Sequence, residues 1–233
     1  MYPIKNPDKK PSPSMLGLML RDAGIKLNDD QLAKLWRYHN LLRVRNQDRD
    51  LTRLIGFESI VVKHYIDCMI VGKICDLPSP LLDIGTGAGF PGIPMKIRYP
   101  HLEIVLAEPR PKRIEFLKEA IGHLGLSRIS IFEHKVVSQS FTRAVKGVIT
   151  RAVETMDKTF LRSSGALRLG SRLIFMKGPN VQEELDEFEW RFSRYAKRVL
   201  DRAYRLPNTA LERRLIVFEV VRLWAEKGSG GER

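Results

Sequence analysis

The chain has 233 residues, of which 43% are hydrophobic and 29% are charged, as is typical of a globular protein with a sizeable core. No apolar run approaches the roughly 20 residues that span a bilayer, and the polar first residues lack the apolar segment of a secretory signal. The formal net charge is +13, and residues 81–180 carry 16 lysines and arginines against 8 acids. This excess indicates a polyanionic partner, nucleic acid before membrane, with a merely soluble basic surface as the alternative.

The N-terminal third is expected to form a helical cap over residues 15–78, after a proline-rich lead-in, residues 1–14, that is expected to be disordered. Asn28 and Gln31 have the spacing of a capping box, and apolar residues follow at three- and four-residue intervals. On that apolar stripe, His39 is expected to be packed rather than catalytic.

A charged run over residues 43–50 predicts a break after this first helix, and a second helix is expected over about 57–75. Cys68 and Cys75 lie seven positions apart in apolar helical surroundings, which favours buried thiols over a disulfide or a metal site. With no Cys/His cluster we expect no structural metal, and we expect a reducing, cytoplasmic compartment.

The stretch over residues 81–92 reads Leu-Leu-Asp-Ile-Gly-Thr-Gly-Ala-Gly-Phe-Pro-Gly. Glycine has no Cβ and tolerates positive φ, so this backbone can bend sharply beneath a ligand. Amides at the start of a following helix can then receive a polar or anionic group. The stretch therefore predicts a strand, a ligand-binding loop and a helix.

The remaining chain alternates short apolar runs with helical patterns. Strands are expected over residues 104–107, 129–132, 147–150, 172–176 and 215–221, and helices over about 111–124, 156–167 and 181–199. This order predicts an α/β fold with a doubly wound, mainly parallel sheet over residues 79–224, followed by a disordered tail, residues 225–233.

Two cofactor classes fit the glycines. Gly87, Gly89 and Gly92 satisfy the dinucleotide fingerprint, and Glu108 lies where an acid would bind ribose hydroxyls in either class. Asp83 at the end of the first strand instead suits a cofactor with an amino-acid ammonium group, and Pro91 and Pro94 remove amides that a pyrophosphate needs. These features favour S-adenosylmethionine and a methyltransferase. A nicotinamide or flavin oxidoreductase and a non-catalytic binding module remain the alternatives.

From about Leu16 to Val221 the chain resembles the bacterial ribosomal small-subunit methyltransferase G family, also called glucose-inhibited division protein B. The first similar segment, residues 83–94, reads Asp-Ile-Gly-Thr-Gly-Ala-Gly-Phe-Pro-Gly-Ile-Pro. The others, in chain order, are Val-Lys-His-Tyr-Ile-Asp at 62–67, Lys-Arg-Ile-Glu-Phe-Leu at 112–117, Thr-Arg-Ala at 150–152, Met-Lys-Gly at 176–178 and Glu-Arg-Arg at 212–214.

The resemblance implies a class I S-adenosylmethionine methyltransferase with a Rossmann-like fold that methylates N7 of a guanine in 16S rRNA or the small ribosomal subunit. It implies cofactor contacts along the glycine loop, at the two strand-end acids, and after the third and fourth strands, namely at Asp83, Gly85, Gly87, Gly89, Phe90, Glu108, Val136, Val137 and Arg151.

Two departures from the family pattern stand out. Val137 replaces an acid that could accept a hydrogen bond from the adenine edge of the cofactor. A neutral hydrogen bond contributes about 1 kcal/mol, so its loss is expected to weaken cofactor binding without abolishing it. Residues 45–52 lack the aromatic that the family commonly has there, which leaves the way the cap meets RNA undefined.

Guanine N7 is an unprotonated lone pair at neutral pH, so methyl transfer needs orientation rather than a general base. We therefore expect no acid–base residue, with Lys177 as a candidate for positioning the substrate. RNA contacts are expected at Lys63, His64, Lys112 and Arg113. The protein is expected to be a monomer without a membrane or metal partner.

Overall fold

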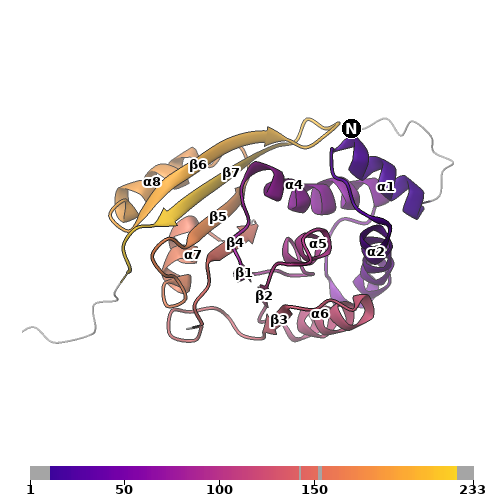
Figure 1. Cartoon of the computed structure of the whole chain (residues 1–233), viewed down its shortest axis with the longest axis horizontal. Coiled ribbons are helices and arrows are strands. Elements are labelled where there is room, and N and C mark those ends of the chain that lie inside the picture. Colours follow the sequence, from indigo (N-terminus) through magenta and orange to yellow (C-terminus); the bar gives the residue numbers. More distant parts are fainter. Residues whose placement is uncertain (1–10, 142, 152–153, 225–233) are drawn as a thin grey trace, which may run out of the picture.

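A seven-stranded sheet forms the centre of the protein in the computed structural model, which describes residues 11–141, 143–151 and 154–224 (Figure 1). The strands lie in the order β3-β2-β1-β4-β5-β7-β6. The first five are parallel, while β7 is antiparallel to both β5 and β6. This topology confirms the predicted doubly wound, mainly parallel α/β sheet. The strands are β1 (Leu81–Ile84), β2 (Ile104–Ala107), β3 (Ile129–Phe132), β4 (Gly147–Arg151), β5 (Arg172–Lys177), β6 (Ala196–Arg205) and β7 (Glu212–Val220).

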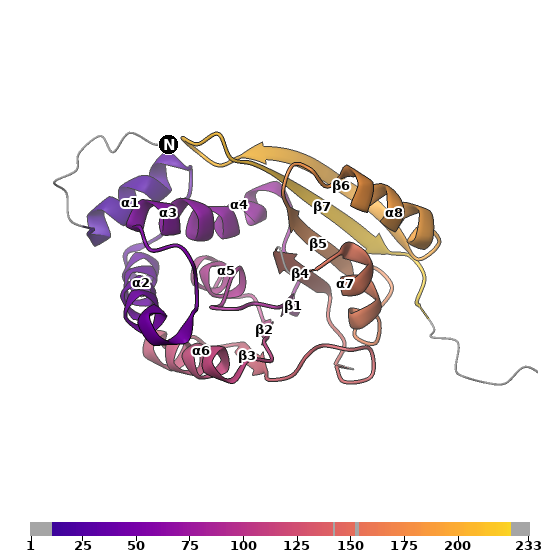
Figure 2. The same cartoon turned by 180° about the vertical axis from the view of Figure 1, so that it is seen from behind.

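Helices cover both faces of the sheet, with α1 to α6 on one side and α7 and α8 on the other (Figures 1 and 2). They are α1 (Pro13–Asp22), α2 (Asp29–Arg49), α3 (Phe57–Ile60), the π-helix η1 (Val61–Ile66), α4 (Asp67–Ile74), α5 (Gly92–Arg98), α6 (Pro111–Leu124), α7 (Met156–Ser163) and α8 (Gln182–Phe192).

Side chains of the central strands alternate between two hydrophobic clusters, because successive residues of a strand point to opposite faces. Leu81 and Ile104 belong to the cluster beneath α1 to α6, whereas Leu82 and Val105 belong to the cluster beneath α7 and α8. The N-terminal helices share the first cluster, so they form one helical layer with α5 and α6. The proposed boundary between a cap over 15–78 and a domain over 79–224 stays a prediction.

Two helix starts and one helix end have the local chemistry that the sequence predicts. Asn28 and Gln31 make both hydrogen bonds of the capping box at the start of α2. Pro111 occupies the first turn of α6, where its missing N–H leaves no hydrogen bond unmade. Gly125 ends α6 in the left-handed conformation with φ 59°.

The expected break over residues 43–50 is wrong, because α2 continues to Arg49. Its charged residues face α6 and pair with acids there. Arg45 makes a bidentate ion pair with Glu119, and Arg49 lies 3.6 Å from Glu115. Helix α1 also begins earlier than expected, at Pro13 with Ser12 as its N-cap. Residues 1–10 and 225–233, which were expected to be disordered, lie outside the described residues.

Strand β6 was not predicted, and the apolar stripe assigned to one helix over 181–199 belongs to two elements. Helix α8 ends at Phe192, and Val199 lies in β6. This strand is an edge of the sheet and is mostly exposed and charged, so it lacks the alternating apolar pattern of a half-buried strand. Helix α7 likewise ends at Ser163, four residues before the expected end.

Candidate functional site

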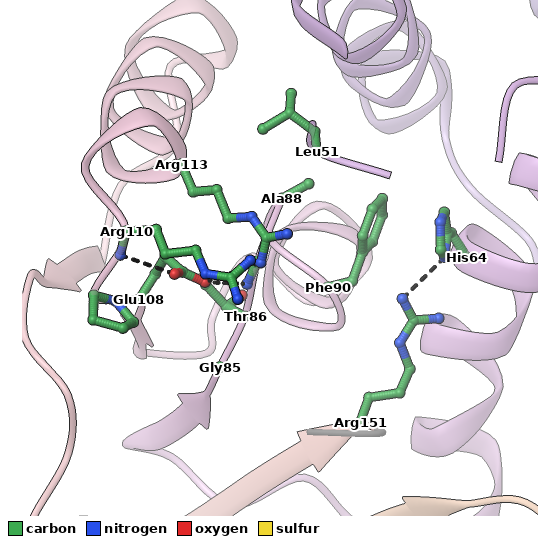
Figure 3. Close-up of a pocket in the computed structure, with 12 residues that line it drawn as sticks. Leu51, His64, Gly85, Thr86, Ala88, Phe90, Glu108, Arg110, Arg113 and Arg151 are labelled. Atoms are coloured by element: carbon green, nitrogen blue, oxygen red, sulfur yellow. Dashed lines mark hydrogen bonds and ion pairs between the residues drawn. The ribbon is translucent and has the colours of Figure 1, made fainter. Parts of the chain in front are cut away.

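A cavity of about 400 Å³ opens at the carboxyl ends of β1, β2 and β4 (Figure 3). The strand order reverses direction between β1 and β4, and open α/β sheets bind their ligands at such a point. The loops after β1 and β2, the end of β4 and two cap residues form its walls. These residues are Leu51, His64, Gly85, Thr86, Gly87, Ala88, Phe90, Glu108, Pro109, Arg110, Arg113 and Arg151.

The glycine loop adopts the backbone conformation that its sequence predicts. Gly85, Gly87 and Gly89 all have positive φ, at 70°, 61° and 97°. Gly85 and Gly87 line the cavity, whereas Gly89 faces α5. A Cβ at Gly89 would lie 2.4 Å from Cδ1 of Ile93, so this glycine allows the loop to approach the helix.

Asp83 lies behind the glycine loop and does not line the cavity. Its Oδ2 accepts hydrogen bonds from the Thr86 hydroxyl at 2.6 Å and from the Gly92 amide at 2.9 Å, so the carboxylate fixes both ends of the loop. Its Oδ1 is buried and has no partner among the described residues. Burial raises the pKa of the Asp83 carboxyl to about 7, although the bonds from Thr86 and Gly92 oppose this shift.

Glu108, at the end of β2, is buried on the side of the cavity formed by the two loops. Its Oε2 accepts the Gly87 amide at 3.0 Å, and its Oε1 accepts the Arg110 amide at 3.0 Å. A carboxylate has about four acceptor sites, so two remain for a ligand. Arg113 lies 3.8 Å from Oε2 and limits the negative charge at this end of the cavity.

Arg151 ends β4 on the opposite side of the cavity (Figure 3). Its guanidinium donates to the Lys63 carbonyl at 2.8 Å, to His64 Nδ1 at 2.9 Å, and to Asp67 Oδ2 at 3.4 Å. Three of its five N–H donors are thus engaged, and two remain. Asp67 also accepts the Tyr204 hydroxyl at 2.9 Å, which connects the cavity wall to β6.

His64 is fixed between Arg151 and Thr52, and its ring stacks on Phe90 with centroids 4.2 Å apart and planes 20° apart. A guanidinium only donates, so Nδ1 must accept, and Nε2 carries the proton toward Thr52 Oγ1 at 2.9 Å. Burial and the Arg151 charge lower the pKa of His64 to about 3. The ring is therefore neutral and does not supply the positive charge expected of an RNA contact.

Five other predicted residues lie outside the cavity lining, and one of them, Lys63, reaches Arg151 only through its backbone carbonyl. Val136 is in the core, and the half-exposed Val137 donates its amide to Ser140 Oγ at 3.0 Å. Lys177 is paired with Glu184 at 2.8 Å and also donates to the Glu154 carbonyl. Lys112 is exposed at the start of α6. The roles assigned to these residues stay predictions.

Sequence reasoning missed several lining residues. Arg110 and Pro109 follow Glu108 directly, and the position of this loop after β2 is the signal that could have identified them. Leu51 comes from the altered segment 45–52, where Asn46 holds the Leu51 and Thr52 amides with its side-chain oxygen. Arg113 also lines the cavity, and the RNA contact expected of it stays a prediction.

S-adenosylmethionine fits the chemistry of these residues. The cavity volume lies within the range of small-ligand sites, about 300–1,000 Å³. Glu108 retains acceptors for ribose hydroxyls, and Arg151 retains donors for a carboxylate. Unpartnered Oδ1 of Asp83 is an acceptor on the side of the loop away from solvent. The cavity thus has an acidic and a basic end, as a cofactor with sugar and amino-acid parts requires.

Neither a metal centre nor a spanning helix is found in the part of the chain that the structure describes. There, no three His, Cys, Asp or Glu side chains come together in a group that could hold a metal ion. Within the same ranges, every helix is too short or too polar to cross a membrane. Cys68 is buried, whereas Cys75 is half-buried rather than fully buried as expected, and neither forms a disulfide.

Solved structures share the fold. The chain is similar to TrmN from Thermus thermophilus, with 16% identity and a TM-score of 0.54 over 67% of this chain and 49% of that one. It is also similar to a ribosomal protein L11 methylase from Lactobacillus delbrueckii subsp. bulgaricus, with 10% identity and a TM-score of 0.52 over 69% and 79%. These likenesses, together with the strand order, show the class I methyltransferase fold.

The sequence comparisons are more specific. The chain is 45% identical to the ribosomal RNA small subunit methyltransferase G 2 of Syntrophobacter fumaroxidans over 91% of its length, although it spans only 42% of that relative. It is 38% identical to the protein of the same name from Bdellovibrio bacteriovorus, over 88% of this chain and 80% of that one. The family model described as rRNA small subunit methyltransferase G matches residues 31–203. The chain therefore belongs to the GidB family, the S-adenosylmethionine-dependent rRNA small subunit methyltransferases G, as the glycine loop and downstream motifs predicted.

Proposed function

We propose that this protein transfers a methyl group from S-adenosylmethionine to N7 of a guanine in 16S rRNA. The observation that carries the proposal is the cavity at the reversal point of the sheet, with a glycine loop as its floor, Glu108 at one end and Arg151 at the other. Family membership supports the reaction class, and the geometry supports the placement of the cofactor.

In this proposal each end of the cavity binds one part of the cofactor. Glu108 accepts the ribose hydroxyls with its two remaining acceptor sites. Arg151 donates its two remaining N–H groups to the amino-acid carboxylate. Gly85 and Gly87 have positive φ and no side chain, which allows close approach of the cofactor to the backbone.

S-adenosylmethionine supplies an electrophilic methyl group on a sulfonium when it is bound. Guanine N7 has a lone pair at neutral pH, so the protein's task is to hold the base in line with the methyl group and exclude water. Such orientation can lower a barrier by several kcal/mol. The neutral His64 agrees with this scheme because its Nδ1 and Nε2 are both engaged with protein groups, and the reaction needs no proton acceptor.

The basic groups outside the cavity support an RNA substrate. Lys112, outside the cavity lining, and Arg110, at its edge, are both exposed, and neither forms an ion pair within the described ranges. Lys63, next to His64, stays a candidate for a phosphate contact. We further propose that the protein acts as a monomer in the cytoplasm. Lys177 is proposed to position the RNA, which requires it to exchange its contact with Glu184 for a substrate group.

The experiment is methyl transfer from radiolabelled S-adenosylmethionine to small ribosomal subunits and to naked 16S rRNA, followed by mapping of the modified base. We expect label at N7 of a single guanine. Cofactor binding without transfer to either substrate would contradict an enzymatic role. Selective binding of a nicotinamide dinucleotide would contradict the cofactor assignment.

A pair of variants tests the placement of the cofactor. Gly85→Arg adds a long cation at a cavity residue with φ 70°, and we expect loss of cofactor binding. Gly122→Arg is the matched control, since a Cβ at this exposed position on α6 meets no atom within 4 Å. The control should bind the cofactor normally. Equal binding by both variants would show that the cavity is not the cofactor site.

A further inference from the structure

A second cavity, of about 590 Å³, lies at the opposite edge of the sheet, at the amino ends of β1, β4 and β5. Its walls are residues 76–78 and 80 before β1, residues 144–146 before β4, and residues 168–172 at the start of β5. Strand β4 separates the two cavities, because Lys146 precedes it and Arg151 ends it. Five residue steps of about 3.3 Å place these cavities roughly 16 Å apart, so they bind different groups.

Three cations surround this second cavity. Lys146 is exposed, and neither it nor Arg168 nor Arg172 forms an ion pair with any residue in the described ranges. The guanidinium of Arg168 donates only to the carbonyls of Gly165 and Leu167, and that of Arg172 reaches the Asp76 carbonyl at 3.4 Å. Asp76 is the one acid among the lining residues, so the cavity keeps a positive charge of about two.

Part of the cavity lining is apolar. Pro78, Pro80 and Leu169 form this part, and Leu169 is 66% exposed, so its side chain is available to a ligand. An apolar surface surrounded by cations matches a nucleotide, whose base or ribose covers the apolar groups while its phosphates meet the cations. A base is available for this contact only where RNA is unpaired.

We propose that the second cavity binds an unpaired segment of small-subunit rRNA, separate from the segment that presents the target guanine. The proposal depends on the rRNA methyltransferase activity proposed above. The contacts to phosphate fix the orientation of the RNA on the enzyme, whereas the cofactor cavity selects the base that is modified. This second contact explains why the basic excess of residues 81–180 extends to the edge of the sheet opposite the cofactor.

The test is the steady-state kinetics of methyl transfer to small-subunit rRNA with the full chain. The triple variant K146A/R168A/R172A should raise the KM for RNA at least tenfold at about 0.1 M salt, while kcat and cofactor affinity stay unchanged. The variant should also bind RNA with a weaker salt dependence. Each phosphate contact to a single strand contributes about 0.7 to the slope of log affinity against log salt, so the loss of three contacts should reduce the slope by about 2.

The matched control removes three exposed cations from another surface. Arg194, Lys197 and Arg202 form no ion pair within the described ranges, and R194A/K197A/R202A removes the same charge from the β6 edge. Its KM should stay within about twofold of the parent. If both triple variants behave alike, the effect is one of net charge and the proposal is wrong.

A single substitution tests the proposal even if the triple variant misfolds. Leu169→Glu introduces an anion at an exposed position and should raise the KM for RNA, whereas Leu169→Gln should change it much less. The proposal is overturned if inorganic phosphate or a nucleoside monophosphate binds in the cavity while the KM for RNA is unchanged in every variant. That result would assign the cavity to a small ligand. Lack of methyl transfer by the parent protein would instead refute the proposed function.

Discussion

Replacing Asp83 by asparagine should increase the stability of the cofactor-free protein above pH 7. Its carboxyl has an ordinary pKa of 3.8, which burial raises to about 7 in the folded state. The folded state therefore binds the proton more tightly than the unfolded state does. The contribution of Asp83 to the free energy of unfolding is therefore highest below about pH 4 and falls as the pH rises to about 7.

The size of the effect follows from the two pKa values. A difference of about three units corresponds to about 4 kcal/mol lost by the time Asp83 is fully ionised. In Asp83→Asn the amide oxygen can still accept from Thr86 and Gly92, but the amide nitrogen replaces the unpartnered Oδ1 and remains unsatisfied, at a cost of about 1–3 kcal/mol. We therefore expect a net gain of about 1–3 kcal/mol at pH 8.

The assay is urea denaturation of both proteins at several pH values between 5 and 8. The stability difference between the variant and the parent should grow from pH 5 to about pH 7 and then level off. Parallel profiles would refute the reasoning, because they would show that Asp83 is ionised with an ordinary pKa. Cofactor titration separates the second role of this residue: if Oδ1 receives the cofactor's ammonium group, Asp83→Asn should weaken binding even though the fold is more stable.

Three further substitutions test other contacts. Gly89→Ala should destabilise the protein by about 2–5 kcal/mol in urea denaturation, because its φ is 97° and its Cβ would clash with Ile93. Tyr204→Phe removes a hydrogen bond to Asp67 and should cost about 1 kcal/mol in denaturation, with a several-fold fall in kcat/KM as Arg151 loosens. His64→Phe retains a ring for stacking but removes the Nδ1 acceptor, so cofactor affinity should fall about tenfold or more by calorimetry.

Two of these substitutions, at Gly89 and at His64, have a control in the chain. Gly122→Ala, on an exposed helical face, should be neutral or stabilising, and an equal loss at Gly89 and Gly122 would contradict the close approach of loop and helix. His123→Phe changes an exposed ring on α6 and should leave cofactor affinity unchanged. An unaltered affinity in His64→Phe would show that Arg151 does not need this histidine.

The sequence predicts the fold well where local and long-range requirements agree. The strands β1 to β5 combine apolar runs with turn residues, and the glycine loop specifies its own backbone conformation. The edge strand β6 has no such pattern because it is exposed and charged. The continuation of α2 to Arg49 is accompanied by ion pairs with Glu119 and Glu115 of α6, which are distant in sequence and not visible in the local pattern.

The site was predictable in its parts but not in its arrangement. Residues of the glycine loop and Glu108 were found because strand ends carry ligand groups in such folds. His64 and Arg113 looked like basic surface groups, since nothing in the sequence shows that one is half-buried beside Arg151 and the other turns toward Glu108. The assignment of Val136 and Val137 rested on the family resemblance, and the cavity lining lies elsewhere.

The π-helix η1 sets the rotational phase between the two α-helical segments that flank it. Each residue of an α-helix turns the chain by about 100°, so the additional residue in a π-turn shifts every later side chain by that angle relative to the preceding segment. In this phase His64 contacts both Phe90 and Arg151, while Asp67, just after η1, contacts Arg151 and Tyr204. Deleting one residue from Val61–Ile66 would restore the α-helical phase and turn one of these two groups away from its partners.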